Sequence, residues 1–173
     1  MNLRERISED EMIAVFVRGE LDSERWGEKI RRLGDLDARA LLEGHRAYER
    51  REGLFHGFPR DVDWFRADVT RDELLDIRYI DWDWWRDVSG GTRSAREAAR
   101  RIRVGEIPGV TAEEHEPRFD HPLIAATTPE LSPIVLLEGH VRLTAYALFP
   151  DRIPDEVEIL LGISEEMAGW ALF

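Results

Sequence analysis

The sequence predicts a mixed α+β protein that is helical near its N-terminus and combines helices with strands after about residue 70. Apolar side chains recur at helical spacing between residues 9 and 52. Further along, continuous apolar runs alternate with segments that begin with helix-capping residues. We therefore expect a helical N-terminal extension, residues 1–69, packed on a compact α/β domain with a mixed sheet, residues 70–173. The 173-residue length is enough to bury a core.

Three helices are expected in the N-terminal part. Residues 9–20 place Met12, Ile13, Phe16 and Val17 on one face. A second helix is expected to begin at the cap Ser23 and to end at Gly34, and a third to run from about Asp37 to Arg51. The Gly-, Pro- and aromatic-rich residues that follow are predicted to be an ordered connector.

Capping signals and apolar runs define the rest of the chain. Thr70 with Glu73 and Ser94 with Glu97 form capping boxes, and the second is predicted to start a helix that reaches about Val104. Strands are expected at 76–82, 122–128, 134–137 and 155–163. A helix is predicted from His140 to Pro150, and a short one from the cap Ser164 to the last residue.

Composition excludes several classes of site. The chain has no cysteine, so disulfides, thiolate metal sites and cysteine nucleophiles are excluded. The formal charge of −12 argues against general affinity for nucleic acid or anionic membranes. The only lysine, Lys29, lies in a helical pattern, so there is no P-loop. No apolar stretch predicts a membrane span or signal peptide, and we expect a cytoplasmic protein.

The pentapeptide LLEGH occurs twice, at residues 41–45 and 136–140. The first copy lies inside a predicted helix, whereas the second spans a predicted strand-to-helix turn, so we interpret the repetition as accidental. In the second copy, the free amides of the helix N-terminus favour a bound anion, especially phosphate. Gly139 would let the ligand approach, Arg142 would bind it, His140 would contact it or carry a proton, and Glu138 would act as a base or hold a metal.

The segment from Pro133 to Ala145 resembles the motif of the ParB/sulfiredoxin-like superfamily. The acidic residue, glycine, polar residue and arginine of that motif are Glu138, Gly139, His140 and Arg142. The resemblance extends over residues 74–163 and leaves out the helices of residues 9–52. It implies a fold whose Gly-x-x-Arg turn binds nucleotide phosphates, with ATP or CTP and Mg²⁺ as candidate ligands.

The chain also departs from this superfamily. It lacks the cysteine of sulfiredoxins, a second nucleotide motif and a following helix-turn-helix, so sulfiredoxin chemistry is excluded and DNA segregation is not expected. One hypothesis is a nucleotide-binding domain that hydrolyses the nucleotide or transfers phosphate to a small acceptor. The other is a non-catalytic interaction protein, with a homodimer among its candidate partners.

Three further features have two interpretations each. The loop Ser89, Gly90, Gly91, Thr92 and Arg93 could be a second anion-binding loop or a plain turn. The histidines and carboxylates of residues 113–121 suit a metal, but their spacing fixes no geometry, and we favour a polar loop. Trp82, Trp84 and Trp85 could stack on a base, although packing against the N-terminal helices is favoured. The arginines of residues 96–103 are predicted to pair with acidic side chains, and His45 to be structural.

Overall fold

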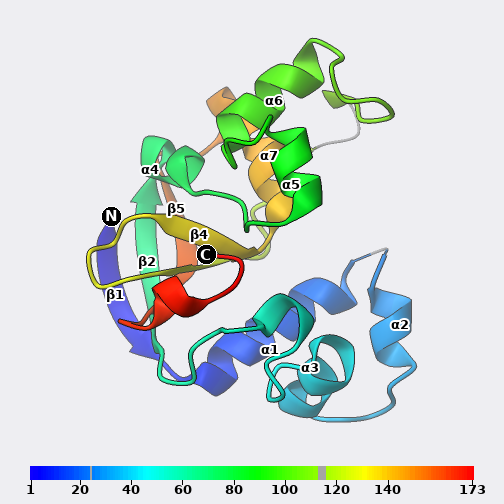
Figure 1. The fold of residues 1–173 in the computed structure, drawn as a ribbon, viewed down its shortest axis with the longest axis vertical. Helices are drawn as coiled ribbons and strands as arrows, with labels where there is room; N and C mark the ends of the chain where they lie inside the picture. Colours follow the sequence, from blue (N-terminus) through cyan, green and yellow to red (C-terminus); the bar gives the residue numbers. More distant parts are fainter. Residues whose placement is uncertain (24, 113–115) are drawn as a thin grey trace.

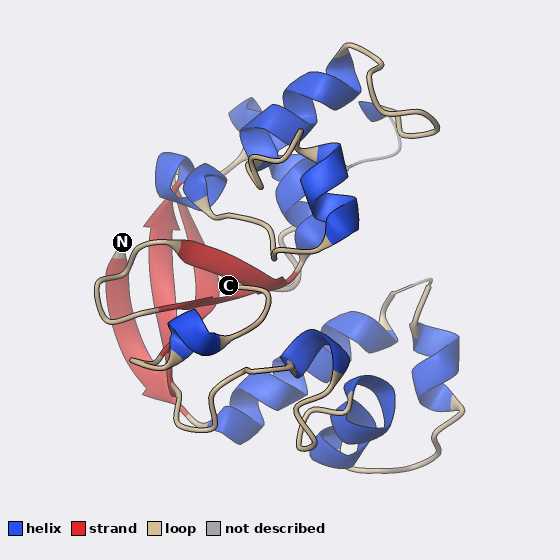
Figure 2. Ribbon diagram, viewed as in Figure 1, coloured by secondary structure: helices blue, strands red, loops and turns tan. Residues whose placement is uncertain are grey.

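The protein, described here by a computed structural model, is a mixed α+β structure in which helices surround a five-stranded sheet (Figures 1 and 2). The structure describes residues 1–23, 25–112 and 116–173. Within these ranges the strands are β1 (Asn2–Ile7), β2 (Asp63–Thr70), β3 (Leu123–Thr127), β4 (Ile134–Glu138) and β5 (Glu156–Ile163). Their order in the sheet is β1-β2-β5-β3-β4; β3 runs parallel to β5, and all other neighbours are antiparallel.

Seven α-helices lie in the described part of the chain, in two groups on either side of a gap between ribbons (Figure 1). The first group, which we call the α1–α3 lobe, consists of α1 (Glu9–Leu21), α2 (Gly27–Arg31) and α3 (Ala38–Arg46). The second, the α4–α7 lobe, consists of α4 (Arg71–Asp76), α5 (Asp83–Val88), α6 (Ala95–Arg103) and α7 (His140–Leu148). Short 3₁₀ turns lie at Gly53–Phe55, Pro150–Arg152 and Met167–Gly169.

The sheet carries a hydrophobic core on each face. Leu123 and Ala125 of β3 pack with buried residues of α4, α6 and α7, whereas Ile124 and Ala126 pack with residues of α1 and the C-terminal segment. Strand side chains alternate between faces, so both faces of β3 must be apolar when both are covered. This explains why β3 is a continuous apolar run.

Most of the predicted helices are confirmed. Thr70 and Glu73 form the complete capping box of α4, and Ser94 caps α6, which ends at Arg103. The helix in the first LLEGH ends earlier than predicted, at Arg46, because Ala47 adopts a left-handed conformation with φ 54°. The prediction of a C-terminal helix is wrong, since only the 3₁₀ turn Met167–Gly169 forms there.

Two strands inside residues 1–69 were not predicted. β2 pairs with β5 along its whole length, from Asp63 opposite Ile163 to Thr70 opposite Glu156, so the expected division after residue 69 falls within a strand. β1 is an edge strand whose side chains are exposed apart from Ile7. Ion pairs of Arg4 with Asp68 and of Arg6 with Asp63 help to hold it. Such a polar edge strand lacks the apolar alternation that reveals a strand.

The predicted strand at 76–82 is wrong. Arg78 makes only isolated bridges, to Ser94 and to Val135, and the tryptophan-rich residues that follow form α5. Aromatic and β-branched residues are enriched in strands, so this run resembles a strand in composition.

Candidate functional site

The second LLEGH forms a strand-to-helix turn, as predicted. β4 ends at Glu138, Gly139 adopts a left-handed conformation with φ 100°, and α7 begins at His140. The first bond of the helix is donated by the Leu143 amide to the Gly139 carbonyl, at 2.9 Å. The amides of residues 140–142 therefore precede the helical ladder. No side chain caps this terminus, and its first turn contains no acidic residue.

Gly139 is required by packing as well as by its backbone conformation. A Cβ at this position would overlap Cδ2 of Leu123 and would lie 3.1 Å from Nη2 of Arg142. The space beside Gly139 is thus filled by the protein's own side chains. This corrects the interpretation that the missing Cβ makes room for a ligand.

Arg142 lies at the turn but is engaged by protein groups. Its guanidinium forms an ion pair with Glu138 and donates to the carbonyls of His121 and Pro122. Both side chains of the ion pair are less than one-fifth exposed. An anion at the α7 N-terminus would therefore share Arg142 with Glu138.

His140 lies in an aromatic stack. Its ring is 5.0 Å from that of Trp85 and 6.0 Å from that of Tyr79, with interplanar angles near 20°. Burial, with the charges of Arg46 and Arg142, lowers the pKa of His140 to about 3. A neutral imidazole donates one hydrogen bond through its N–H and accepts one at its other nitrogen. With so low a pKa, His140 is neutral at pH 7 and does not act as an acid there.

Glu138 connects the turn with the α1–α3 lobe. A Cβ on Gly19 of α1 would lie 3.8 Å from its Oε2. Burial raises the pKa of Glu138; Arg142 opposes the shift, and the nearby carboxylate of Glu20 adds to it. The end of β4 and the end of α1 therefore place two carboxylates near each other.

Glu20, His45 and Arg46 form a buried cluster at the ends of α1 and α3. Arg46 forms an ion pair with Glu20, and Nε2 of His45 lies 3.6 Å from Oε2 of Glu20. The side chains of Glu20 and His45 are only 7% and 9% exposed. Burial by itself raises the pKa of Glu20, but His45 and Arg46 outweigh it, and the pKa lies below its usual value. Glu20 is thus held as a carboxylate.

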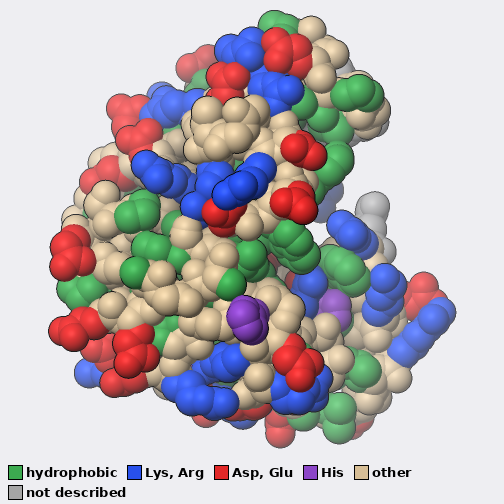
Figure 3. Space-filling view, in the orientation of Figure 1, with side chains coloured by type: hydrophobic (Ala, Val, Ile, Leu, Met, Phe, Trp, Pro, Cys, Tyr) green, Lys and Arg blue, Asp and Glu red, His purple; other side chains and the backbone are tan. Residues whose placement is uncertain are grey.

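These mostly buried groups lie where the two lobes meet, a boundary that we call the inter-lobe cleft. We define it by Glu20, His45, Arg46, Glu138, His140 and Arg142. The space-filling view shows the molecular surface notched between the two lobes (Figure 3). At the same boundary, Nε2 of His121 lies 3.0 Å from Oδ2 of Asp22. Arg46 also lies 4.6 Å from the centre of the Trp26 ring. Residues of both LLEGH copies, His45 and Glu138 to His140, thus belong to one cluster.

Three nitrogens in the cleft are buried without a partner. Among the described residues, six buried side-chain nitrogens have no hydrogen-bond partner, and half of them belong to His45 (Nε2), Arg46 (Nε) and His140 (Nε2). A buried polar atom without a partner costs roughly 1–3 kcal/mol, so a cluster of them is unusual unless something binds there. The arginine nitrogen can only donate, so it requires an acceptor.

Glu20 and Arg46 were not predicted as site residues from the sequence, and His45 was predicted to be structural. Glu20 and His45 stand on helical faces that pack inward, and no short motif joins them to Glu138. The only signal was a histidine and an arginine inside a predicted helix, which is common; in the structure they lie in the last turn of α3.

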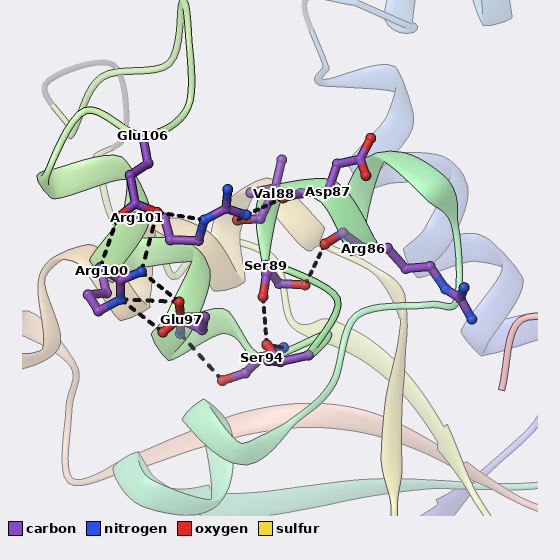
Figure 4. Close-up of polar contacts among 10 residues, drawn as sticks. Arg86, Asp87, Val88, Ser89, Ser94, Glu97, Arg100, Arg101 and Glu106 are labelled. Carbon is purple, nitrogen blue, oxygen red and sulfur yellow. Dashed lines mark hydrogen bonds and ion pairs between the residues drawn. The ribbon is translucent and has the colours of Figure 1, made fainter.

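The loop Ser89 to Arg93 uses its polar groups internally. The Ser89 hydroxyl donates to the Trp85 carbonyl at 2.6 Å and accepts from the Arg93 amide at 2.8 Å. Thr92 Oγ1 donates to the Ser89 carbonyl, and the amides of Gly90 and Gly91 donate to carbonyls of α5. These contacts favour a turn between α5 and α6 over a second anion-binding loop (Figure 4).

Arg93 joins this turn to the C-terminus. Its guanidinium donates to the carbonyls of Tyr79 and Phe173, at 2.8 and 2.7 Å. The arginines of α6 are also engaged, as predicted: Arg100 and Arg101 bind Glu106, Arg100 also binds Glu97 (Figure 4), and Arg96 binds Asp72. Arg103 donates to the carbonyls of Ala147 and Leu148 at the end of α7.

The tryptophans of residues 82–85 do not pack on the N-terminal helices as a group. Trp82 and Trp84 are 49% and 56% exposed, and only Trp85 is stacked inside, on Tyr79 and His140. In a strand, Trp82 and Trp84 would face one side and Trp85 the other. Residues 83–88 instead form the helix α5, so only Trp85 is directed into the protein.

Metal-binding residues do not gather in the described ranges. No group of three His, Asp or Glu side chains suited to a metal ion occurs among residues 1–23, 25–112 and 116–173. Of the proposed metal loop, residues 113–115 lie outside the described residues, and His121 pairs with Asp22. Glu138 offers one carboxylate, which Arg142 already engages. No helix in the described part of the chain is long and apolar enough to cross a membrane.

Comparison of the chain with protein-family models, with curated proteins and with solved structures found no match.

Proposed function

We propose that the inter-lobe cleft binds the phosphates of a nucleotide, with a nucleoside triphosphate such as ATP or CTP as the ligand. The observation that carries this proposal is the set of unpartnered buried nitrogens of His45, Arg46 and His140 beside an uncapped helix N-terminus. Phosphate oxygens are acceptors for the Nε–H of Arg46 and for an imidazole Nε2 that carries a hydrogen.

Charge supports an anionic ligand. The protein is acidic overall, with a formal charge of −12, yet Arg46 and Arg142 approach His140 closely enough to lower its pKa. Two arginines near one helix N-terminus would be unfavourable without counter-charges, which Glu20 and Glu138 supply in part. A phosphate group would supply the rest.

The resemblance of residues 74–163 to the ParB/sulfiredoxin-like superfamily motivates the choice of a nucleotide. Its Gly-x-x-Arg segment coincides with the β4–α7 turn. Mg²⁺ would arrive with the phosphates, since Glu138 alone provides one shared carboxylate.

Calorimetric titration with ATP, CTP and GTP, with and without Mg²⁺, tests the proposal. We expect at least one nucleotide to bind and Arg142→Ala to weaken its binding more than ten-fold. Arg100→Ala, which removes a paired surface arginine of α6, is the matched control and should bind normally. Absence of binding to all three nucleotides would refute the proposal.

A non-catalytic interaction protein is the second candidate. The exposed rings of Trp82 and Trp84 favour it, because exposed tryptophans are enriched at protein interfaces. If this function is correct, sedimentation should show a dimer that Trp84→Ser dissociates, and no nucleotide should bind.

A further inference from the structure

We propose that Glu20 is the catalytic base of a phosphohydrolase centre in the inter-lobe cleft, and that His45 positions it. This inference rests on the proposed function, in which a nucleoside triphosphate binds at the N-terminus of α7. Of the two reactions that the sequence left open, it selects hydrolysis of the terminal phosphate over transfer to an acceptor, and it assigns this activity to residues of α1 and α3.

The geometry of Glu20 fits a base that is fixed in place. Its Oε1 accepts from Nη2 of Arg46, and its Oε2 lies 3.6 Å from Nε2 of His45. That separation is longer than a hydrogen bond, so Oε2 retains capacity to accept one from water. The side chain is 7% exposed and therefore cannot swing freely into solvent.

His45 is the second, independent observation. Its side chain is 9% exposed, its Nε2 has no hydrogen-bond partner among the described residues, and that nitrogen faces the Glu20 carboxylate. The ring is also fixed from another side, by an edge contact with Trp26 at 5.1 Å. The 3.6 Å separation brings His45 close to the Glu20 carboxylate but leaves its Nε2 without a hydrogen bond, which indicates a site in which a small molecule such as water completes the contacts.

The pKa values of the two carboxylates in the cleft are shifted in opposite directions. Glu20 is held ionised by His45 and Arg46, whereas burial favours the proton-bearing form of Glu138. Adjacent titratable groups whose environments separate their pKa values mark acid–base assignments. Glu20 is accordingly the carboxylate of the pair that is ionised at neutral pH and whose oxygens can accept a hydrogen bond from water.

The reaction balances with water as the only co-reactant. The water oxygen forms a bond to the terminal phosphorus, and the bond from that phosphorus to the bridging oxygen breaks. The electron pair of that bond stays on the bridging oxygen, which leaves as part of the nucleoside diphosphate. The proton of the attacking water passes to Glu20 and from there to solvent, while Arg46 and Arg142 interact with the phosphate charge.

The test is release of inorganic phosphate from the nucleotide that binds in calorimetry. We expect turnover by the wild type, a loss of about 100-fold in kcat for Glu20→Gln, and partial recovery in Glu20→Asp. The Kd of Glu20→Gln should be unchanged or smaller, since a negative charge is removed. Glu43→Gln, which alters a carboxylate on the outer side of the same lobe, is the control and should keep full kcat.

The pH profile separates a catalytic role from a structural one. The groups around Glu20 are His45 and Arg46 from α3 and Glu138 from β4. The wild-type kcat should fall at low pH as Glu20 takes up a proton, and this acidic limb should disappear in Glu20→Gln. His45→Asn should lower kcat more than it raises KM. Nucleotide binding without hydrolysis by the wild type would overturn the inference and leave the binding proposal intact, whereas absence of binding would refute both.

Discussion

Gly139→Ala should destabilise the protein through two separate effects at the β4–α7 turn. The first is the left-handed conformation, φ 100°, which costs a residue with a Cβ roughly 1–2 kcal/mol. The second is the overlap of the new Cβ with Leu123, a fully buried residue of β3, and overpacking of a core costs roughly 1–3 kcal/mol. The sum predicts a loss of about 2–5 kcal/mol in the free energy of unfolding.

Gly34→Ala provides a matched control. Gly34 has nearly the same conformation, φ 96°, but no atom lies within 4 Å of the position that its Cβ would occupy. It should therefore lose only the first term, about 1–2 kcal/mol. The double variant Leu123→Ala with Gly139→Ala should cost less than the sum of its single variants, because the smaller side chain removes the overlap.

Urea unfolding of these variants measures both terms. The dependence of the unfolding free energy on urea concentration should be similar in all variants, so that differences in midpoint report differences in stability. If Gly139→Ala loses no more free energy of unfolding than Gly34→Ala, then Leu123 does not occupy the space beside the turn and the second effect is absent.

Three further predictions concern the cleft and the C-terminal segment. The pKa of His140 is lowered to about 3, so as the pH falls the unfolded chain binds this proton first, and stability should fall below about pH 6.5 by up to about 1.4 kcal/mol per pH unit. Urea titrations between pH 7 and pH 5 should show that the free energy of unfolding changes less with pH in His140→Phe than in the wild type. An equal change with pH would contradict the burial of a neutral His140. Glu138→Gln removes a charge that competes for Arg142, so ATP should bind about five-fold more tightly by calorimetry, and weaker binding would contradict the competition. Arg93→Ala removes the bonds to the C-terminal carbonyls, and hydrogen exchange should accelerate in residues 164–173, whereas Arg86→Ala, whose partner is Asp81, should leave it unchanged.

Local signals in the sequence predicted the parts of the fold that depend on local interactions. The caps Thr70 and Ser94, the apolar strands β3 to β5 and the turn at Gly139 were all visible as short patterns. β1 was not, because its stability comes from pairing with β2 and from ion pairs such as that of Arg4 with Asp68. Such contacts leave no periodicity in the strand itself.

The candidate site was predictable only in part, for the same reason. Glu138, His140 and Arg142 share one segment, and the turn places them together. Glu20 and Arg46 reach this segment only because α1 packs on one face of the sheet and α3 packs on α1. The role of Gly139 also differed from expectation, since what fills its missing Cβ position is a strand residue that the sequence could not place there.

The central claim is that both lobes contribute to one anion site, and the ATP affinity of Arg46→Lys tests it most directly. Lysine keeps the positive charge beside Glu20 but lacks the unpartnered Nε–H, and a charge-assisted hydrogen bond is worth roughly 1.5–3 kcal/mol. The Kd of Arg46→Lys should be at least ten-fold higher than that of the wild type, with the urea midpoint preserved and Arg100→Lys unaffected. An unchanged Kd in Arg46→Lys would show that the α1–α3 lobe takes no part in binding, so that no anion site is shared between the lobes.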